Sequence, residues 1–225
     1  MGWLLRFMNS SIGKKFVMAV TGSFLMIFLI VHLIGNLTLY FGPETFNGYV
    51  ETLEVIKPLI RVIELVLVLA FVYHIIYGTW LWIENKRARP VSYKINASSE
   101  NSSFSSRWMF WLGSIVFIFL VIHLATFFYR FNFYDPEGLA DQSKYYNIVV
   151  GFLQMPWYSI LYLIAIVMLG LHLHHGFQSA FQTFGWNHKK YTPIIKALGT
   201  IYAIVICGAF ASIPIYFLFF FGGSQ

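Results

Sequence analysis

Five long runs of apolar residues alternate with shorter polar segments along this chain. Each run has about 20 or more residues, enough for a helix to cross the ~30 Å hydrocarbon core of a bilayer. The runs predict transmembrane helices at residues 12–40, 58–85, 107–130, 156–184 and 193–221. Pro58 and Gly185 support two of these limits, because proline favours the first helical positions and glycine the position after the last. We therefore expect an all-α membrane protein with one transmembrane domain over residues 1–225.

The composition agrees with a membrane protein and excludes two kinds of cysteine chemistry. Only 11% of the residues are charged and 58% are hydrophobic, whereas soluble domains carry about 25% charged residues. The first apolar run is too long for the core of a signal peptide, so we expect no cleaved leader. The single cysteine, Cys207, excludes an intrachain disulfide and a cysteine-ligated iron–sulfur cluster within this chain.

The basic residues are distributed unevenly between the two sides of the predicted spans. Eleven lie on the side of the N-terminus: Arg6, Lys14, Lys15, Lys86, Arg87, Arg89, Lys94, Arg107, Lys189, Lys190 and Lys196. Four lie on the other side: Lys57, Arg61, Arg130 and Lys144. The positive-inside rule predicts a cytoplasmic N-terminus and an external C-terminus. Because these charges flank membrane spans, the net charge of +6 gives no indication of nucleic-acid binding.

Four histidines stand inside the apolar runs, about one per crossing: His32, His74, His123 and His172. Ionisable side chains are costly in hydrocarbon and mark functional sites. At a helical rise of ~1.5 Å per residue, the first and third lie roughly 24–25 Å from the cytoplasmic ends of their helices, and the second and fourth roughly 18 Å. Depth therefore predicts an outer pair, His32 with His123, and an inner pair, His74 with His172.

Glycines repeat around these histidines in two patterns. Gly22 and Gly113 each precede an outer histidine by ten residues, and Gly78 and Gly176 each follow an inner histidine by four. A missing side chain lets a flat macrocycle or another helix approach closely. Two imidazoles on one iron leave no open coordination position, which suits electron transfer. We therefore predict two haems b inside a four-helix bundle, with each histidine pair ligating one iron and the fifth helix packed outside.

Neighbouring residues leave alternatives at the inner haem. His175 lies three residues after His172, close to the same helical face, and is the second candidate for that ligand. Arg107, Lys189 and Lys190 lie near the cytoplasmic ends of the spans and are candidates to contact the haem propionates.

Five short stretches are not distinctive one by one, but their order along the chain is specific. They are Ser11-Ile12-Gly13-Lys14-Lys15, Val31-His32-Leu33, Val72-Tyr73-His74-Ile75-Ile76-Tyr77-Gly78, Arg107-Trp108-Met109-Phe110 and His172-Leu173-His174-His175-Gly176. Together they resemble the cytochrome b subunit of succinate:quinone oxidoreductases, the family of succinate dehydrogenases and fumarate reductases. The resemblance is to the five-span, two-haem form made as one polypeptide, and it covers nearly the whole chain.

The resemblance implies a place in a larger complex. His74 and His172 would hold the proximal haem, and His32 and His123 the distal one. Two soluble partners would bind on the cytoplasmic side of a bacterial inner membrane: a flavoprotein with FAD, which interconverts succinate and fumarate, and an iron–sulfur subunit. This chain would pass electrons between the iron–sulfur subunit and bound menaquinone or menaquinol, without carboxylate chemistry of its own.

A segment before the second span suggests how protons reach the quinone. Glu54-x-x-Lys57-Pro58 resembles a segment of menaquinol-oxidising fumarate reductases, in which such a glutamate handles the quinol proton. Quinone chemistry moves protons with electrons, so a carboxylate near the ring is useful. Glu64, deeper in the second span, would either pair with Arg61 at helical spacing or serve the same proton role. The alternative for Glu54 is an exposed carboxylate of an outer loop.

Two other functions remain open on the residues alone. A diheme b-type anchor of another dehydrogenase, such as a hydrogenase or formate dehydrogenase, also uses histidines on four helices. A transporter or channel would use intramembrane histidines to carry protons or ions and would bind no haem. The five-span order and the repeated His-x-x-x-Gly pattern favour the succinate:quinone oxidoreductase subunit over both.

Overall fold

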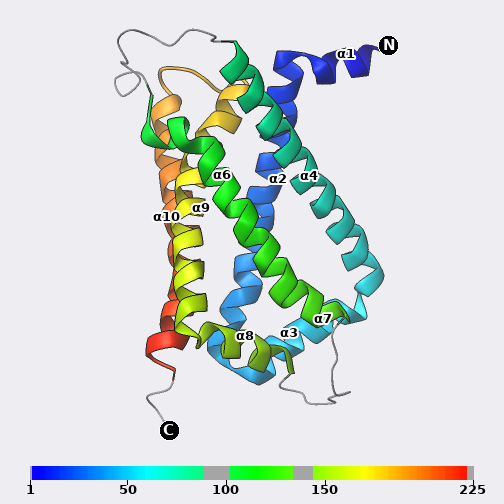
Figure 1. The fold of residues 1–225 in the computed structure, drawn as a ribbon, viewed down its shortest axis with the longest axis vertical. Helices are drawn as coiled ribbons and strands as arrows, with labels where there is room; N and C mark the ends of the chain where they lie inside the picture. Colours follow the sequence, from blue (N-terminus) through cyan, green and yellow to red (C-terminus); the bar gives the residue numbers. More distant parts are fainter. Residues whose placement is uncertain (1, 89–101, 134–143, 222–225) are drawn as a thin grey trace. The chain divides into compact units, whose positions relative to one another are not determined.

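The computed structural model describes residues 2–88, 102–133 and 144–221, and Figure 1 shows its helices in chain order. All regular secondary structure in these ranges is helical: α1 (Trp3–Asn9), α2 (Ser11–Leu37), the 3₁₀ turn η1 (Thr38–Phe41), α3 (Pro43–Val55), α4 (Lys57–Arg87), α6 (Phe104–His123), the π-helical turn η2 (Leu124–Phe128), α7 (Tyr129–Phe133), α8 (Lys144–Leu153), α9 (Pro156–Thr183) and α10 (Thr192–Phe219). Arg89 and Lys94, used above for the orientation, lie outside the described residues, as does the side chain of Lys144.

Five helical stretches are long and apolar enough to cross a membrane, which confirms the all-α class and indicates a multi-pass membrane protein. They are Ser11–Phe41, Lys57–Arg87, Phe104–Phe133, Pro156–Thr183 and Thr192–Phe219. Each limit lies within three residues of the range predicted from the apolar runs. Most side chains along these stretches are not buried inside the protein, as expected for helices whose apolar faces meet lipid tails.

Turn residues fix where the helices begin and end. Pro156 is the first residue of α9, where its missing N–H costs no hydrogen bond. Gly185 has φ +85°, a conformation that a side chain would strain. This turn lets the N–H of Trp186 reach the carbonyl of Phe181 at 3.0 Å and satisfies the end of the helix. The predicted stop at Gly185 is therefore observed.

Three short helices were not expected from the apolar runs: α1, α3 and α8. The turn between α1 and α2 depends on Gly13, because a Cβ there would lie 1.8 Å from the carbonyl oxygen of Phe7. Gly35 of α2 similarly admits the phenol of Tyr49 from α3, whose atoms lie 2.6–2.7 Å from where a Cβ would stand. Burial raises the pKa of this phenol above its ordinary value.

The chain divides into two compact units, and each takes a segment from every spanning helix. The first contains Met1–Phe28, Ile63–Leu112 and Leu171–Ala203, and the second contains Leu29–Val62, Gly113–Gly170 and Ile204–Gln225. One histidine pair falls in each unit, the inner pair in the first and the outer pair in the second.

An ion pair and stacked rings join the helices of the first unit. The ammonium of Lys14 is buried and lies 2.5 Å from a carboxylate oxygen of Glu84, which also accepts the indole N–H of Trp80 at 2.8 Å. The same ammonium lies 4.3 Å from the centre of the Trp80 ring, so the charge has both an anion and a π face as partners. Trp82 of α4 stacks on Phe110 of α6 with ring centres 4.0 Å apart.

The fifth spanning helix, α10, packs against α2 and α9. In the first unit, the hydroxyl of Tyr202 donates to the carbonyl of Met26 at 2.6 Å, and Phe177 lies against Gly199. In the second unit, the ring centre of Phe210 lies 5.8 Å from that of His32. The helix predicted to pack outside the other four therefore reaches one of the four histidines.

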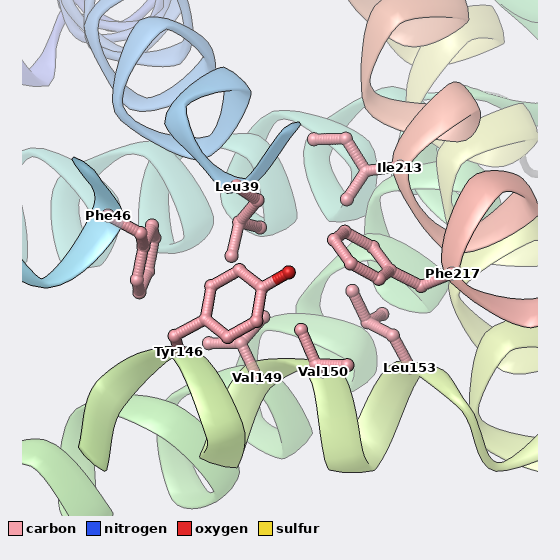
Figure 2. Packing of buried hydrophobic residues seen from close by; sticks show 8 residues of the cluster. All are labelled: Leu39, Phe46, Tyr146, Val149, Val150, Leu153, Ile213 and Phe217. Atoms are coloured by element: carbon pink, nitrogen blue, oxygen red, sulfur yellow. The ribbon is translucent and has the colours of Figure 1, made fainter. Parts of the chain in front are cut away.

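The core of the second unit joins two of the short helices to the membrane spans. Figure 2 shows its eight buried residues: Leu39, Phe46, Tyr146, Val149, Val150, Leu153, Ile213 and Phe217. They come from η1, α3, α8 and α10, so the apolar faces of α3 and α8 are buried against each other and against a spanning helix. The side chain of Asn47, 2% exposed, accepts the backbone N–H of Tyr146 at 2.9 Å and so caps the start of α8.

Replacing Asn47 with leucine tests this cap. The substitution leaves the buried N–H of Tyr146 without its acceptor, which we expect to lower the free energy of unfolding by about 1–3 kcal/mol. Equilibrium unfolding in detergent measures the change. Gln154→Leu is the control, because Gln154 is exposed and its replacement should change stability by less than about 0.5 kcal/mol. Equal effects of the two substitutions would contradict a specific role for the Asn47 oxygen.

Candidate functional site: two facing histidine pairs

The inner pair lies in the first unit, between α4 and α9. The ring centres of His74 and His172 are 6.2 Å apart, and the ring planes meet at 66°. Nδ1 of His74 lies 3.2 Å from the hydroxyl oxygen of Thr21 on α2. That hydroxyl gives its one hydrogen to the carbonyl of Val17 at 2.8 Å, so it accepts from Nδ1–H. His74 therefore keeps the lone pair of Nε2 for another partner.

His172 carries the complementary signal. In the described part of the chain, its Nδ1 is buried and has no hydrogen-bond partner. Buried polar atoms are nearly always paired, so each exception needs an explanation. A metal ion bound at either ring nitrogen would account for a polar ring in an apolar helix, and binding at Nδ1 would also give the unpaired atom a partner. His172, rather than the alternative His175, is the histidine whose ring faces His74.

Three of the four predicted glycines lie near the inner pair, and the tightest approach to a neighbouring side chain is at Gly22. A Cβ on Gly22 would stand 3.2 Å from Cε1 of His74, so this glycine lets α2 approach the imidazole. The corresponding positions on Gly78 and Gly176 lie 3.4 Å and 3.8 Å from methionine methyl groups, those of Met18 and Met109. Methionine is flexible and fills irregular gaps, so these contacts can adapt to a flat ligand. The fourth, Gly113, is half-buried on α6 in the second unit.

The outer pair lies in the second unit, between α2 and the end of α6. The ring centres of His32 and His123 are 5.7 Å apart, with the planes at 89°. Nδ1 of His123 lies 2.8 Å from the phenol oxygen of Tyr162 on α9. Nε2 of His32 lies 3.4 Å from the amide nitrogen of Asn36, a long and weak contact. The helical positions and depths thus predicted both histidine pairs, but not the hydroxyl groups that contact them.

Aromatic rings and an irregular turn surround His123. Phe119 and Phe127, one turn before and after it on the same helix, have ring centres 5.7 Å and 5.5 Å from the imidazole. The helix changes from α to π directly after His123, over Leu124–Phe128. Single π turns are rare and occur often at functional sites. The π turn had no signal in the apolar pattern, because it changes the hydrogen bonding of the backbone rather than the residue types.

The ring-centre distances of the two pairs can be compared with the spacing that a shared metal ion would require. A histidine nitrogen lies about 2.0–2.1 Å from a first-row metal ion and about 1.1 Å from its ring centre, so two collinear rings have centres about 6.3 Å apart. The inner pair, at 6.2 Å, fits this spacing, and the outer pair, at 5.7 Å, needs to open by roughly half an ångström. No group of three or more His, Cys, Asp or Glu side chains suited to a metal occurs among the described residues. Two histidines without further ligands would suit a macrocycle that supplies the other ligands to the metal.

The predicted quinone residues lie outside both histidine pairs. Glu54, at the end of α3, is exposed and pairs with Lys57 at 3.4 Å. The guanidinium of Arg61 on α4 donates to the amide oxygen of Asn132 on α7 at 2.6 Å. Glu64 is half-buried one turn further along α4. An exposed carboxylate can exchange protons with water, as proton transfer to a quinone requires.

The predicted propionate contacts are all exposed residues of the first unit, the unit that holds the inner pair. Arg107 donates to the backbone carbonyl of Ser102. The ammonium of Lys190 lies 5.8 Å from the ring centre of Tyr191, and Lys189 precedes it in the same connection between α9 and α10. These contacts leave the cations at the surface, where they can meet an anionic group.

No protein-family model matches the chain, and no curated protein or solved structure is significantly similar to it.

Proposed function

We propose that this chain is the diheme cytochrome b membrane anchor of a succinate dehydrogenase or fumarate reductase complex. It carries electrons between an iron–sulfur subunit and menaquinone or menaquinol. The supporting observation is that four imidazoles from four different helices form two pairs. The ring centres are 6.2 Å apart in the inner pair and 5.7 Å apart in the outer pair. Such spacing suits two bis-histidine haems, and the order of the short sequence stretches supports this family over other diheme anchors.

Each histidine has a distinct task under this proposal. His74 and His172 hold the proximal haem, and His32 and His123 hold the distal one. Bound haem iron supplies one-electron transfer, and two imidazoles leave it no open position for substrate. Thr21 fixes the Nδ1–H form of its histidine, so Nε2 stays free to ligate. The apolar helices exclude water from both sites.

The partners and the orientation follow from the charges. The N-terminus would be cytoplasmic in a bacterial inner membrane, as the excess of Lys and Arg on that side indicates. The iron–sulfur subunit, with the FAD-containing flavoprotein beyond it, would then bind on the side of the inner pair. Arg107, Lys189 and Lys190 are exposed there, available to haem propionates or to the partner.

In the second unit, Glu54 would transfer the quinol proton. Its carboxylate is exposed and only loosely held by Lys57 at 3.4 Å, so water can reach it. It belongs to the same unit as the outer pair, the haem that would exchange electrons with the quinone. Glu64 would be a second carboxylate for the same proton.

The first prediction from the proposed function concerns the haem content. The purified protein should show reduced-minus-oxidised bands of haem b at two haems per chain. His172→Ala should lower this to about one, because the remaining imidazole cannot hold the proximal haem alone. His175→Ala is the matched control, one turn away on the same helix, and should leave two. Pyridine haemochrome assay together with protein quantification gives the ratio.

Other outcomes separate the rival functions. A colourless protein with intact helices would favour a transporter that uses histidines for protons. Loss of a haem in His175→Ala but not in His172→Ala would move the proximal ligand. Two haems in a complex that co-purifies without succinate:quinone activity would favour the anchor of a different dehydrogenase.

The second prediction concerns the quinone proton. Glu54→Gln removes a general acid or base and should lower quinol-driven fumarate reduction by about 10²-fold in the whole complex. The haem content and the stability should stay unchanged, because an exposed ion pair contributes at most ~1 kcal/mol. Glu51→Gln is the control, an exposed glutamate one turn earlier on α3. Equal activity of the two variants would exclude Glu54 from the proton transfer and direct the test to Glu64→Gln.

A further inference from the structure

We propose that Tyr162 is a positioning residue for the outer haem, which it tunes through His123. Its phenol oxygen would accept the Nδ1–H of His123, leaving Nε2 to ligate the iron. This inference rests on the proposed function, because it assigns a role at one of the two haems. Neither the apolar pattern nor the histidine spacing indicates Tyr162, which lies on a different helix from its histidine.

The contact is short, and its tyrosine is buried. The phenol oxygen of Tyr162 lies 2.8 Å from Nδ1 of His123, and the tyrosine is 9% exposed. The ring of Phe119 meets the Tyr162 ring edge-on, with centres 4.7 Å apart, which limits the positions that the phenol can take. A tyrosine hydroxyl this far from water needs a hydrogen-bond partner, and the imidazole provides one.

A second tyrosine also contacts the phenol oxygen of Tyr162. The hydroxyl of Tyr158, a residue only 1% exposed, donates to the phenol oxygen of Tyr162 at 3.0 Å. The side chain of Thr126 in turn hydrogen-bonds to Tyr158. With Nε2 of His123 on the iron, Nδ1 would carry the ring hydrogen, so Nδ1 would be the donor and the Tyr162 oxygen the acceptor.

The resulting chain of groups begins and ends on one helical stretch. It runs from His123 through Tyr162 and Tyr158 to Thr126, which lies in the π turn three residues after the histidine. A ring of contacts that returns to the helix carrying the ligand holds the imidazole in one orientation. A π turn shifts the side chains that follow it relative to a regular α-helix, and here it is the segment that carries Thr126.

The two histidine pairs differ in the hydroxyl group that contacts one of their imidazoles. His74 donates to an aliphatic hydroxyl at 3.2 Å, whereas His123 contacts a phenol oxygen at 2.8 Å. An acceptor on Nδ1–H raises the basicity of the ligating nitrogen, and a more basic ligand stabilises oxidised iron. The shorter contact should therefore hold the outer haem at a lower potential than it would have without Tyr162. The effect should not extend to the inner haem, whose ligands belong to the other unit.

Tyr162→Phe in the full, haem-loaded protein tests the inference. We expect two haems to remain and the one lost in His123→Ala to become about tenfold easier to reduce. Tenfold corresponds to a rise of about 59 mV for a one-electron couple. Optical redox titration measures both haems in one experiment. Thr21→Val should shift the haem that is lost in His74→Ala and leave the outer one unchanged.

Two further variants complete the design. Tyr40→Phe removes a hydroxyl of the same unit that binds Ser212 at 2.7 Å rather than a histidine, and it should shift neither potential. If Tyr162→Phe fails to assemble, Tyr158→Phe is the alternative. It keeps the contact between Tyr162 and His123 but removes the hydroxyl that donates to the Tyr162 oxygen, so the reduction potential of the outer haem alone should shift.

Each contrary result has its own meaning. Two haems with unchanged potentials in Tyr162→Phe and Tyr158→Phe would show that the tyrosines only pack, which overturns the inference but leaves the proposed function intact. A shift of the inner haem in Tyr162→Phe would overturn the link to His123. A wild-type protein without haem would overturn both.

Discussion

The structure depends on the cost of placing imidazoles in apolar helices. An imidazole has two nitrogens, and in hydrocarbon each needs a partner that lipid cannot supply. The chain provides a hydroxyl for one nitrogen of His74 and of His123, which leaves the second nitrogen of each for a further group. For His172, Nδ1 has no hydrogen-bond partner among the residues that the structure describes. A protein under selection for stability alone would have apolar residues here, so the remaining demand is best explained by a ligand.

The side chains around each histidine pair also fit the need of the imidazoles for partners. Gly22 brings α2 close enough for Thr21, the preceding residue, to reach His74. The flexible side chains of Met18 and Met109 lie against glycines on the helices that carry the inner histidines, where a rigid branched residue would fix the gap. Around His123 the neighbours are instead aromatic rings. The inner site is thus lined by adaptable side chains and the outer site by rigid ones.

The sequence alone predicted the five membrane helices, because apolar runs of about 20 residues have few alternatives to such helices. Helical rise also grouped His32 with His123 and His74 with His172, since depth depends only on residue counts between charged ends. It could not reveal Tyr162 or Thr21 as contacts, because these depend on how the helices rotate about their axes. Nor did it reveal α3 and α8: their apolar residues are too few for a span and become a core only when two helices and α10 meet.

Those short helices also connect the outer histidine pair to the surface. Phe127, whose ring centre lies 5.5 Å from that of His123, packs against the buried cluster of α3, α8 and α10. Phe46 of α3 belongs to that cluster, and Glu54 stands at the end of the same helix. The carboxylate proposed for the proton and the ligand proposed for the electron are thus supported by one core. Quinone chemistry needs both at one place, because neither transfer is complete without the other.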